Sequence, residues 1–135
     1  MKALSILQPW AWFILYGGKD IENRTWRTRY RGPLLIHAGK RFSMSTVSAD
    51  VERAEAIVHG IGTAPASEPS LGMLKALTGG IVGCVILVDC VREHPSPWAQ
   101  PGYWHWVLAD PVALPLIPLR GALGLFEIEE PEVAQ

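Results

Sequence analysis

The sequence predicts a mainly β fold of the α+β class, a small closed barrel of about six strands covered by two or three helices. Residues 80–93 form a nearly continuous β-branched run, which is typical of a strand buried on both faces. Residues 103–108 and 123–129 alternate in the manner of strands with one buried face. With 135 residues, 49% of them hydrophobic and 19% charged, the chain fits one domain with one core, residues 1–135.

The first predicted helix lies between the first two strands. Residues 2–6 have the pattern of a strand, and Pro9 suits the first position of a helix, where a missing backbone N–H costs little. Residues 10–16 continue as an apolar helical segment, and Gly17 and the glycine after it supply the backbone freedom that ends the helix. We therefore expect a helix over residues 8–16, packed at one end of the barrel.

The later elements follow from periodicity and from punctuation by glycine and proline. First come a strand at 33–38 that turns at Gly39, an amphipathic helix that ends near Gly60, a loop at 62–72 and a helical turn at 71–77. The strand at 80–93 follows, and a loop at 94–102 leads from it to a strand at 103–108. A proline-punctuated connection at 110–118 then leads to a last strand at 123–129, before a frayed acidic end. No internal repeat or domain-sized linker interrupts this series.

A polar cluster is predicted directly after the first helix. If the segment from Lys19 to Trp26 is an extended strand, Asp20, Glu22 and Arg24 point to one face, because alternate residues of a strand share a face. Lys19 then lies at the mouth of the strand and Trp26 beyond it. The sequence therefore predicts carboxylate and cationic groups beside an aromatic wall.

Positive charge is concentrated in the basic stretch, residues 19–41. It contains seven basic and two acidic side chains, about +5, whereas the whole chain has a net charge of −1. The rest of the chain therefore has a net charge of about −6. This asymmetry makes the basic stretch a candidate surface for an anionic partner, which the overall charge conceals.

Three short motifs occur in order within the first part of the chain. They are S-I-x-Q-P-W-A at 5–11, G-x-K-x-x-E-x-R-T-W at 17–26 and R-G-P-L-L-I-H-A at 31–38. Together they resemble the ASCH (activating signal cointegrator 1 homology) domain, and P-L-R-G-A-L-G-L-F at 118–126 is a weaker echo of it. The resemblance implies a PUA-like β-barrel with a cleft suited to RNA, DNA or a nucleoside.

Lys19 and Glu22 are the candidate catalytic residues if the protein is an enzyme. A lysine beside apolar and cationic neighbours can act as a base or nucleophile, and the alternative is a solvated lysine after a helix. Glu22 suits a general base or an acceptor for the amino group of a nucleobase, and also an ion-pair partner of Arg24 or Lys19. Some ASCH-like proteins are amidohydrolases of acetylated cytidine, with a Lys and a Thr three residues later. Here Glu22 stands in place of that Thr, so the specific activity does not carry over.

The expected ligand site is a cleft in which polar groups converge on a base beside an aromatic face. Its candidate residues are Gln8, Trp10, Lys19, Glu22, Arg24, Trp26, His37, Trp106, Arg120 and Gly121. We expect Lys19, Glu22 and Arg24 to line the main pocket together with at least one of the three tryptophans. The alternative for each tryptophan is core packing, and His37 suits a satisfied barrel residue as well as an acid or base.

Arginines alternate with other side chains just before the strand at 33–38. If this segment is extended, Arg27, Arg29 and Arg31 share one edge, where they suit phosphate contacts, and Lys40 is a fourth candidate. The alternative is a solvated edge strand protected by its charges. The partner that these residues imply is a nucleic acid or a nucleoside, with RNA favoured.

Several functional classes are excluded by what the sequence lacks. It has no Walker-type loop, dinucleotide fingerprint or nucleophile elbow, so no cofactor is implied, and its Cys and His spacing implies no metal. Cys84 and Cys90 lie in one predicted strand with Cα atoms roughly 20 Å apart, so we expect free thiols. No apolar run approaches the roughly 20 residues of a membrane span. Pro9 and two early tryptophans argue against a signal peptide, so the expected compartment is the cytoplasm.

Three functions fit these features. The leading hypothesis is a nucleic-acid-binding module, with RNA favoured, that recognises an unpaired or modified base in a cleft. The alternatives are a small hydrolase of an N-acylated cytidine-type nucleoside or of RNA, and a protein-interaction adaptor in transcription or RNA metabolism. The choice between RNA, DNA and a free nucleoside stays open at this point, as does the oligomeric state.

Overall fold

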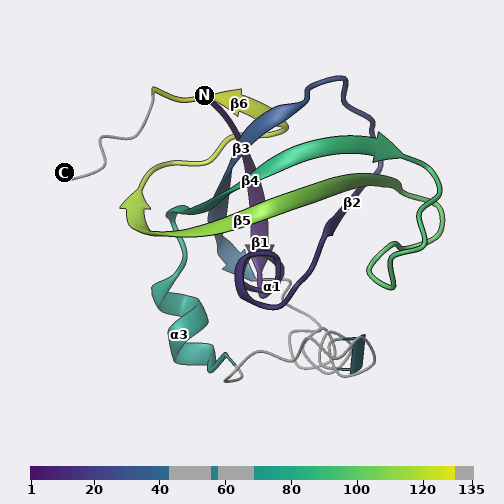
Figure 1. Ribbon diagram of the computed structural model, residues 1–135. Coiled ribbons are helices and arrows are strands. Elements are labelled where there is room, and N and C mark those ends of the chain that lie inside the picture. Colours follow the sequence, from purple (N-terminus) through teal and green to yellow (C-terminus); the bar gives the residue numbers. More distant parts are fainter. Residues whose placement is uncertain (43–55, 58–68, 130–135) are drawn as a thin grey trace.

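A six-stranded sheet dominates the computed structural model, which describes residues 1–42, 56–57 and 69–129 (Figure 1). Its elements are β1 (Lys2–Gln8), α1 (Trp10–Tyr16), β2 (Ile21–Arg24), β3 (Gly32–Phe42), α3 (Leu71–Ala76), β4 (Gly80–Val91), β5 (Trp104–Pro118) and β6 (Leu125–Glu127). The fold is mainly β, as predicted. The predicted helix that ends near Gly60 and the acidic end after residue 129 lie outside the described residues.

The strands follow the order β2–β5–β4–β3–β1–β6. β1 and β3 are parallel, and the other neighbouring pairs are antiparallel. β4 pairs with a strand on each side, and its residues Ile81, Val82, Val85 and Leu87 are buried. A strand enclosed in this way needs apolar side chains on both faces. The central strand predicted at 80–93 is therefore confirmed.

The sheet is open, so the predicted closed barrel is wrong. Within the described residues, β2 pairs only with β5 and β6 only with β1, and these two edge strands have four and three residues. A closed barrel needs a continuous ladder around the axis, and such short edge strands offer few hydrogen bonds to complete it. A side chain reaches from β2 to β1 instead, because Arg24 Nη2 donates to the main-chain oxygen of Ser5 at 2.8 Å.

β5 runs through the prolines that were predicted to interrupt it. It continues to Pro118, so the separate connection predicted at 110–118 is wrong. Only the first part of β5, Trp104 to Val107, pairs with β2, and the rest pairs with β4 alone. This later half is therefore a sheet edge, where the missing backbone N–H of a proline interrupts no hydrogen bond of the sheet. Asp110, near the start of this half, has a φ of 52°.

Two further boundaries differ from the prediction. β3 does not turn at Gly39 but continues to Phe42, which pairs with Gln8 of β1 after a register shift. A glycine inside a strand commonly marks such an irregularity rather than a turn. The last strand, predicted at 123–129, contracts to β6, where three residues pair with β1.

α1 begins directly after Pro9 and ends directly before Gly17. The Pro9 carbonyl accepts a hydrogen bond from Phe13 N at 3.1 Å, and Gly17 N donates to the Phe13 carbonyl at 2.9 Å. Proline therefore precedes the first helical residue instead of occupying it, and the helix that was predicted over 8–16 covers 10–16.

α1 connects two parts of the apolar core. Ala11 and Ile14 join the main cluster, which β1, β3, β4 and β5 supply, whereas Trp12 and Phe13 pack with Trp98 in a second cluster. Figure 1 shows α1 nearly end-on beside the end of β1. This packing fixes where the chain leaves the helix and enters β2.

Neither a disulfide, a metal cluster nor a membrane-spanning helix is found among the described residues. Cys84 and Cys90 are free thiols, as predicted, and burial raises the pKa of the Cys84 thiol. No group of three or more His, Cys, Asp or Glu side chains in this part of the chain has an arrangement that could hold a metal ion. No helix there combines the length and apolar character that crossing a bilayer requires.

Candidate functional site

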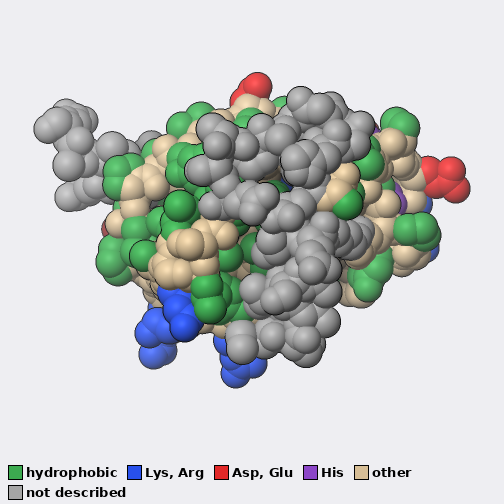
Figure 2. Space-filling model, turned by 90° about the horizontal axis from the view of Figure 1, so that it is seen from below, with side chains coloured by type: hydrophobic (Ala, Val, Ile, Leu, Met, Phe, Trp, Pro, Cys, Tyr) green, Lys and Arg blue, Asp and Glu red, His purple; other side chains and the backbone are tan. Residues whose placement is uncertain are grey.

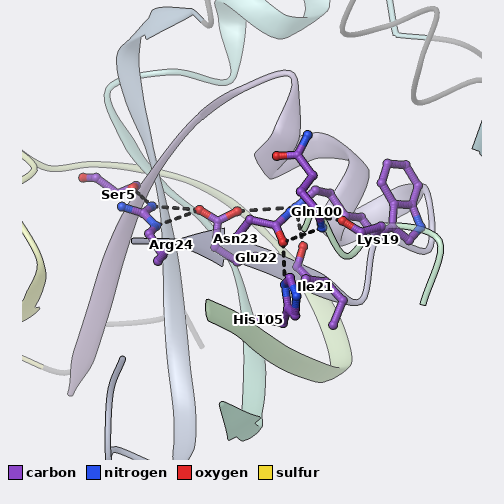
Figure 3. Close-up of polar contacts among 9 residues, drawn as sticks. Ser5, Lys19, Ile21, Glu22, Asn23, Arg24, Gln100 and His105 are labelled. Carbon is purple, nitrogen blue, oxygen red and sulfur yellow. Dashed lines mark hydrogen bonds and ion pairs between the residues drawn. The ribbon is translucent and has the colours of Figure 1, made fainter. Parts of the chain in front are cut away.

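Three charged side chains form a cluster around β2 (Figure 3). Arg24 Nε donates to Glu22 Oε2 at 2.9 Å, and Arg24 Nη2 lies 2.8 Å from the same oxygen in an ion pair. On the other side, Lys19 Nζ lies 3.4 Å from Glu22 Oε1 and also donates to the Ile21 main-chain oxygen. The Glu22 carboxylate therefore lies between two cations. We call Lys19, Glu22 and Arg24 the charged cluster.

Lys19 is buried, so the alternative of a solvated lysine is wrong. Its exposed fraction is 5%, and Nζ lies 5.6 Å from the centroid of the Trp10 ring. The backbone N–H of Lys19 donates to the Phe13 carbonyl at 3.0 Å, so Lys19 lies directly after α1. Asp20, by contrast, is exposed and accepts a hydrogen bond from Ser96 Oγ at 2.6 Å, away from the cluster.

A series of hydrogen bonds leads from the charged cluster to β3. Arg24 reaches the Ser5 main-chain oxygen, and Ser5 Oγ lies 2.7 Å from His37 Nδ1. His37 Nε2 lies 2.6 Å from the Leu119 main-chain oxygen. Because a carbonyl can only accept, Nε2 carries the proton and Nδ1 accepts from the Ser5 hydroxyl. The network therefore assigns His37 one tautomer and one orientation.

A cavity of about 750 Å³ lies beside Ser5 and His37, where β3 and β5 end. Four predicted ligand or phosphate residues line it, namely His37, Lys40, Arg120 and Gly121. Gly121 lies against the pair so closely that a Cβ atom would be 2.4 Å from Ser5 Oγ and 2.7 Å from His37 Cε1. Only glycine permits this approach. Ser5 is a site residue that the sequence reasoning missed, although it opens the first motif.

The charged cluster adjoins this cavity without forming its walls. Glu22 and Arg24 line neither this cavity nor the cavity of about 650 Å³ beside Arg92 and His105, and Lys19 lines a separate hollow of about 90 Å³. Both oxygens of Glu22 already accept from cations, and Arg24 spans from Glu22 to Ser5. The cluster therefore holds Ser5, which in turn holds His37 at the cavity.

Trp26 is the exposed indole among the candidate tryptophans. Its exposed fraction is 36%, and it meets the fully buried Trp106 edge-on, with ring centroids 4.8 Å apart. Trp106 Nε1 donates to the Trp26 carbonyl at 3.2 Å, so Trp106 supports Trp26 from the core. Gln8 is also buried, and its amide accepts from Trp12 N and donates to the Leu77 carbonyl. Trp106 and Gln8 therefore act as packing and positioning residues.

The arginines before β3 are exposed, but they do not form the edge strand that was predicted. The chain becomes irregular after β2, because pairing with β5 ends at Arg24. Arg27 and Arg29 extend from this connection, whereas Arg31 is partly held by Asp89 at 3.5 Å. Lys40 lies near the other end of β3, on the cavity. At about 3.3 Å per residue, roughly 30 Å of strand separates it from the arginines.

A second polar network, centred on Asn23, was also missed (Figure 3). Asn23 Nδ2 donates to the Trp98 carbonyl at 3.0 Å. Asn23 Oδ1 accepts from Gln100 N at 3.0 Å and from His105 Nδ1 at 2.8 Å. These bonds fasten the loop between β4 and β5 onto β2. The sequence held one signal for this network, because strand parity placed Asn23 on the face opposite Glu22.

Comparison with known proteins places this fold and these residues in a family. The model of the ASCH domain matches residues 4–117. Activating signal cointegrator 1 of Mus musculus is 37% identical over 92 residues, which cover 67% of this chain and 14% of that protein. The protein of the same name from Homo sapiens is 31% identical over 91 residues, again 67% of this chain and 14% of that protein. The chain therefore spans a small part of these relatives and belongs to the ASCH domain family.

Proposed function

We propose that this chain is a nucleic-acid-binding module, with RNA as the favoured ligand, that holds an unpaired or modified base in the cavity beside Ser5 and His37. The observation that carries the proposal is the cavity itself, a space of about 750 Å³ with a fixed imidazole and two cations, Lys40 and Arg120, in its wall. Such cavities suit a small planar ligand that needs a few convergent polar groups. Membership of the ASCH family is consistent with this function.

The chemistry of the cavity wall favours a base over a purely anionic ligand. Lys40 and Arg120 are donors, which suit the carbonyl oxygens and ring nitrogens of nucleobases. Leu119 and Leu123 supply apolar surface for the face of a ring. Both nitrogens of His37 are already bonded, so this residue shapes the wall rather than reading the base.

The exposed residues at the other end of β3 suit the backbone of a longer strand. Arg27 and Arg29 lie beside the exposed Trp26, within the stretch that carries about +5. On the face shown in Figure 2, by contrast, hydrophobic side chains cover much of the described surface, and Lys and Arg side chains gather at one edge. Because the length of β3 separates these arginines from the cavity, an oligonucleotide fits both better than a mononucleotide does.

The proposal predicts salt-dependent binding of short single-stranded RNA. If Arg27 and Arg29 each neutralise one phosphate, these two contacts alone should give a slope of log affinity against log salt near −1.4, at about 0.7 per contact. Arg29→Ala should flatten the slope by about one contact for every sequence. Trp26→Ala should leave the slope unchanged but lose roughly 1 to 3 kcal/mol of stacking. Fluorescence anisotropy of a labelled RNA at three salt concentrations measures both effects.

A duplex of the same sequence is the control ligand, and it should bind more weakly because a base must be unstacked to enter the cavity. An absence of binding at low salt, or an affinity that neither substitution changes, would refute the nucleic-acid function. Either result would favour the protein-interaction adaptor.

A second candidate function, hydrolysis of an N-acylated cytidine-type nucleoside or of RNA, is favoured by one contact. The buried Lys19 ammonium lies 3.4 Å from Glu22 Oε1, and such a pair can transfer a proton if substrate binding shortens this distance. Incubation with N-acetylcytidine and with RNA, followed by chromatography, tests it. Product formation that Lys19→Met abolishes would establish this function, and intact substrates would exclude it for these ligands.

A further inference from the structure

Two guanidinium groups lie near one indole, at the end of the sheet opposite the large cavity. Arg27 Cζ lies 5.9 Å and Arg92 Cζ 5.1 Å from the centroid of the Trp104 ring. Three elements converge here, because Arg24 at the end of β2 pairs with Trp104, and Arg92 directly follows β4. The sequence reasoning gave Arg92 no role, since it lies outside the basic stretch.

The charges of these two guanidiniums are close enough to repel each other. From the two distances to the ring, their Cζ atoms are no more than about 11 Å apart. This separation is close to the Debye length of about 10 Å at 0.1 M salt, so they still repel each other. Both arginines are exposed, and neither makes an ion pair within the described residues. Arg31 differs, because Asp89 neutralises part of its charge. An anion bound between Arg27 and Arg92 would relieve their repulsion.

A second cavity, of about 650 Å³, continues from Arg92. His94 and His105 line it, with Glu93 as its one acidic residue among those described. His94 Nδ1 accepts from Ser96 N at 3.0 Å, so its Nε2 carries the proton and is a donor. The cavity wall near Arg92 is therefore rich in donors.

The orientation of His105 is fixed by Asn23. Because Asn23 Nδ2 donates to the Trp98 carbonyl, Oδ1 is the atom that faces His105, and His105 Nδ1 must be the donor. Burial lowers the pKa of His105, the main-chain hydrogen bond with Arg92 opposes this, and the positive charge of Arg92 lowers it further. The pKa of His105 is therefore sensitive to the charge bound in this cavity.

We propose that Trp104, Arg27 and Arg92 form a phosphate-binding platform, at which a phosphate group of a single-stranded nucleic acid or of a free nucleotide lies between the two guanidiniums at the mouth of the second cavity. Arginine suits this role because its planar fork can contact two phosphate oxygens at once. This inference rests on the proposed function, and it adds a backbone contact that the motifs do not predict.

The test compares Arg92→Ala with Lys75→Ala, which removes the same charge from an exposed position on α3. The probe is a labelled RNA of about eight uridines, within the 4 to 16 nucleotides that small β domains cover. Arg92→Ala should reduce the salt slope by about 0.7 and weaken binding about three- to fivefold. Lys75→Ala should change neither quantity. Arg92→Lys should retain the slope but recover only part of the affinity, because lysine lacks the planar fork.

His105 supplies a second readout. Its imidazole signals, followed by NMR against pH, should show a higher pKa in the presence of the RNA, because a bound phosphate offsets the charge of Arg92. If RNA binds and Arg92→Ala behaves like Lys75→Ala, the platform is wrong while the proposed function stands. If no RNA binds to the wild type, the proposed function fails, and uridine monophosphate then decides the platform. A rise in the His105 pKa that Arg92→Ala removes would support the platform, and an unchanged pKa would overturn it.

Discussion

Glu22→Ala should lower the free energy of unfolding by about 3 kcal/mol, because it removes a buried carboxylate that lies between two cations. Lys19 is 5% exposed, and Glu22 Oε1 is its carboxylate partner at 3.4 Å. Arg24 would lose its hydrogen bond and its ion pair with Glu22 Oε2 in the same step. Urea unfolding followed by far-UV circular dichroism measures the loss, which should appear as a lower midpoint with an unchanged m value.

Glu127→Gln is the matched control for this substitution. Glu127 also pairs with two cations, the N-terminal ammonium at 2.9 Å and Lys2 at 3.0 Å, but its side chain is 62% exposed. Its midpoint should hardly change, since water screens surface pairs. The double variant Lys19→Met with Glu22→Gln should recover part of the lost stability, because it removes the buried ammonium together with its partner. Equal effects of Glu22→Ala and Glu127→Gln would mean that the charged cluster is not a buried ion pair.

Gly121→Ala should damage both stability and ligand binding. The new Cβ would lie 2.4 Å from Ser5 Oγ and 2.9 Å from His37 Nδ1, so these side chains or the loop must move. Such overpacking typically costs 1 to 3 kcal/mol. Because Ser5 and His37 line the large cavity, base-dependent RNA binding should fall about tenfold, while the salt slope set by the distant arginines stays the same.

Gly72→Ala is the control for Gly121→Ala. Gly72 lies inside α3, and a Cβ there meets nothing within 4 Å. Alanine should stabilise this helix by up to about 1 kcal/mol, because glycine costs more backbone entropy. The two variants are compared by thermal unfolding and by RNA anisotropy. If Gly121→Ala retained wild-type stability and affinity, the close contact of Gly121 with Ser5 and His37 would not be required for the site.

The sequence by itself determined the features that depend on neighbouring residues. Proline and glycine bound α1, and the apolar run that begins at residue 80 became the central strand, whose first half is largely buried between two neighbouring strands. Strand parity placed Glu22 and Arg24 on one face, where they form a hydrogen bond and an ion pair. The exposed arginines also follow from their local alternation with partly buried residues, although the segment that carries them is not a strand.

Only the tertiary structure decided the features that depend on distant pairing. The sequence did not reveal that the edge strands are too short to close a barrel, or that the later half of β5 is an edge that tolerates proline. The contact of Arg24 with Ser5 joins residues 19 positions apart, and that of His37 with Leu119 joins residues 82 apart. The two guanidiniums near Trp104 also come from separate connections, one after β2 and one after β4. Local patterns specify which face a residue occupies, whereas sheet order and twist determine which faces meet.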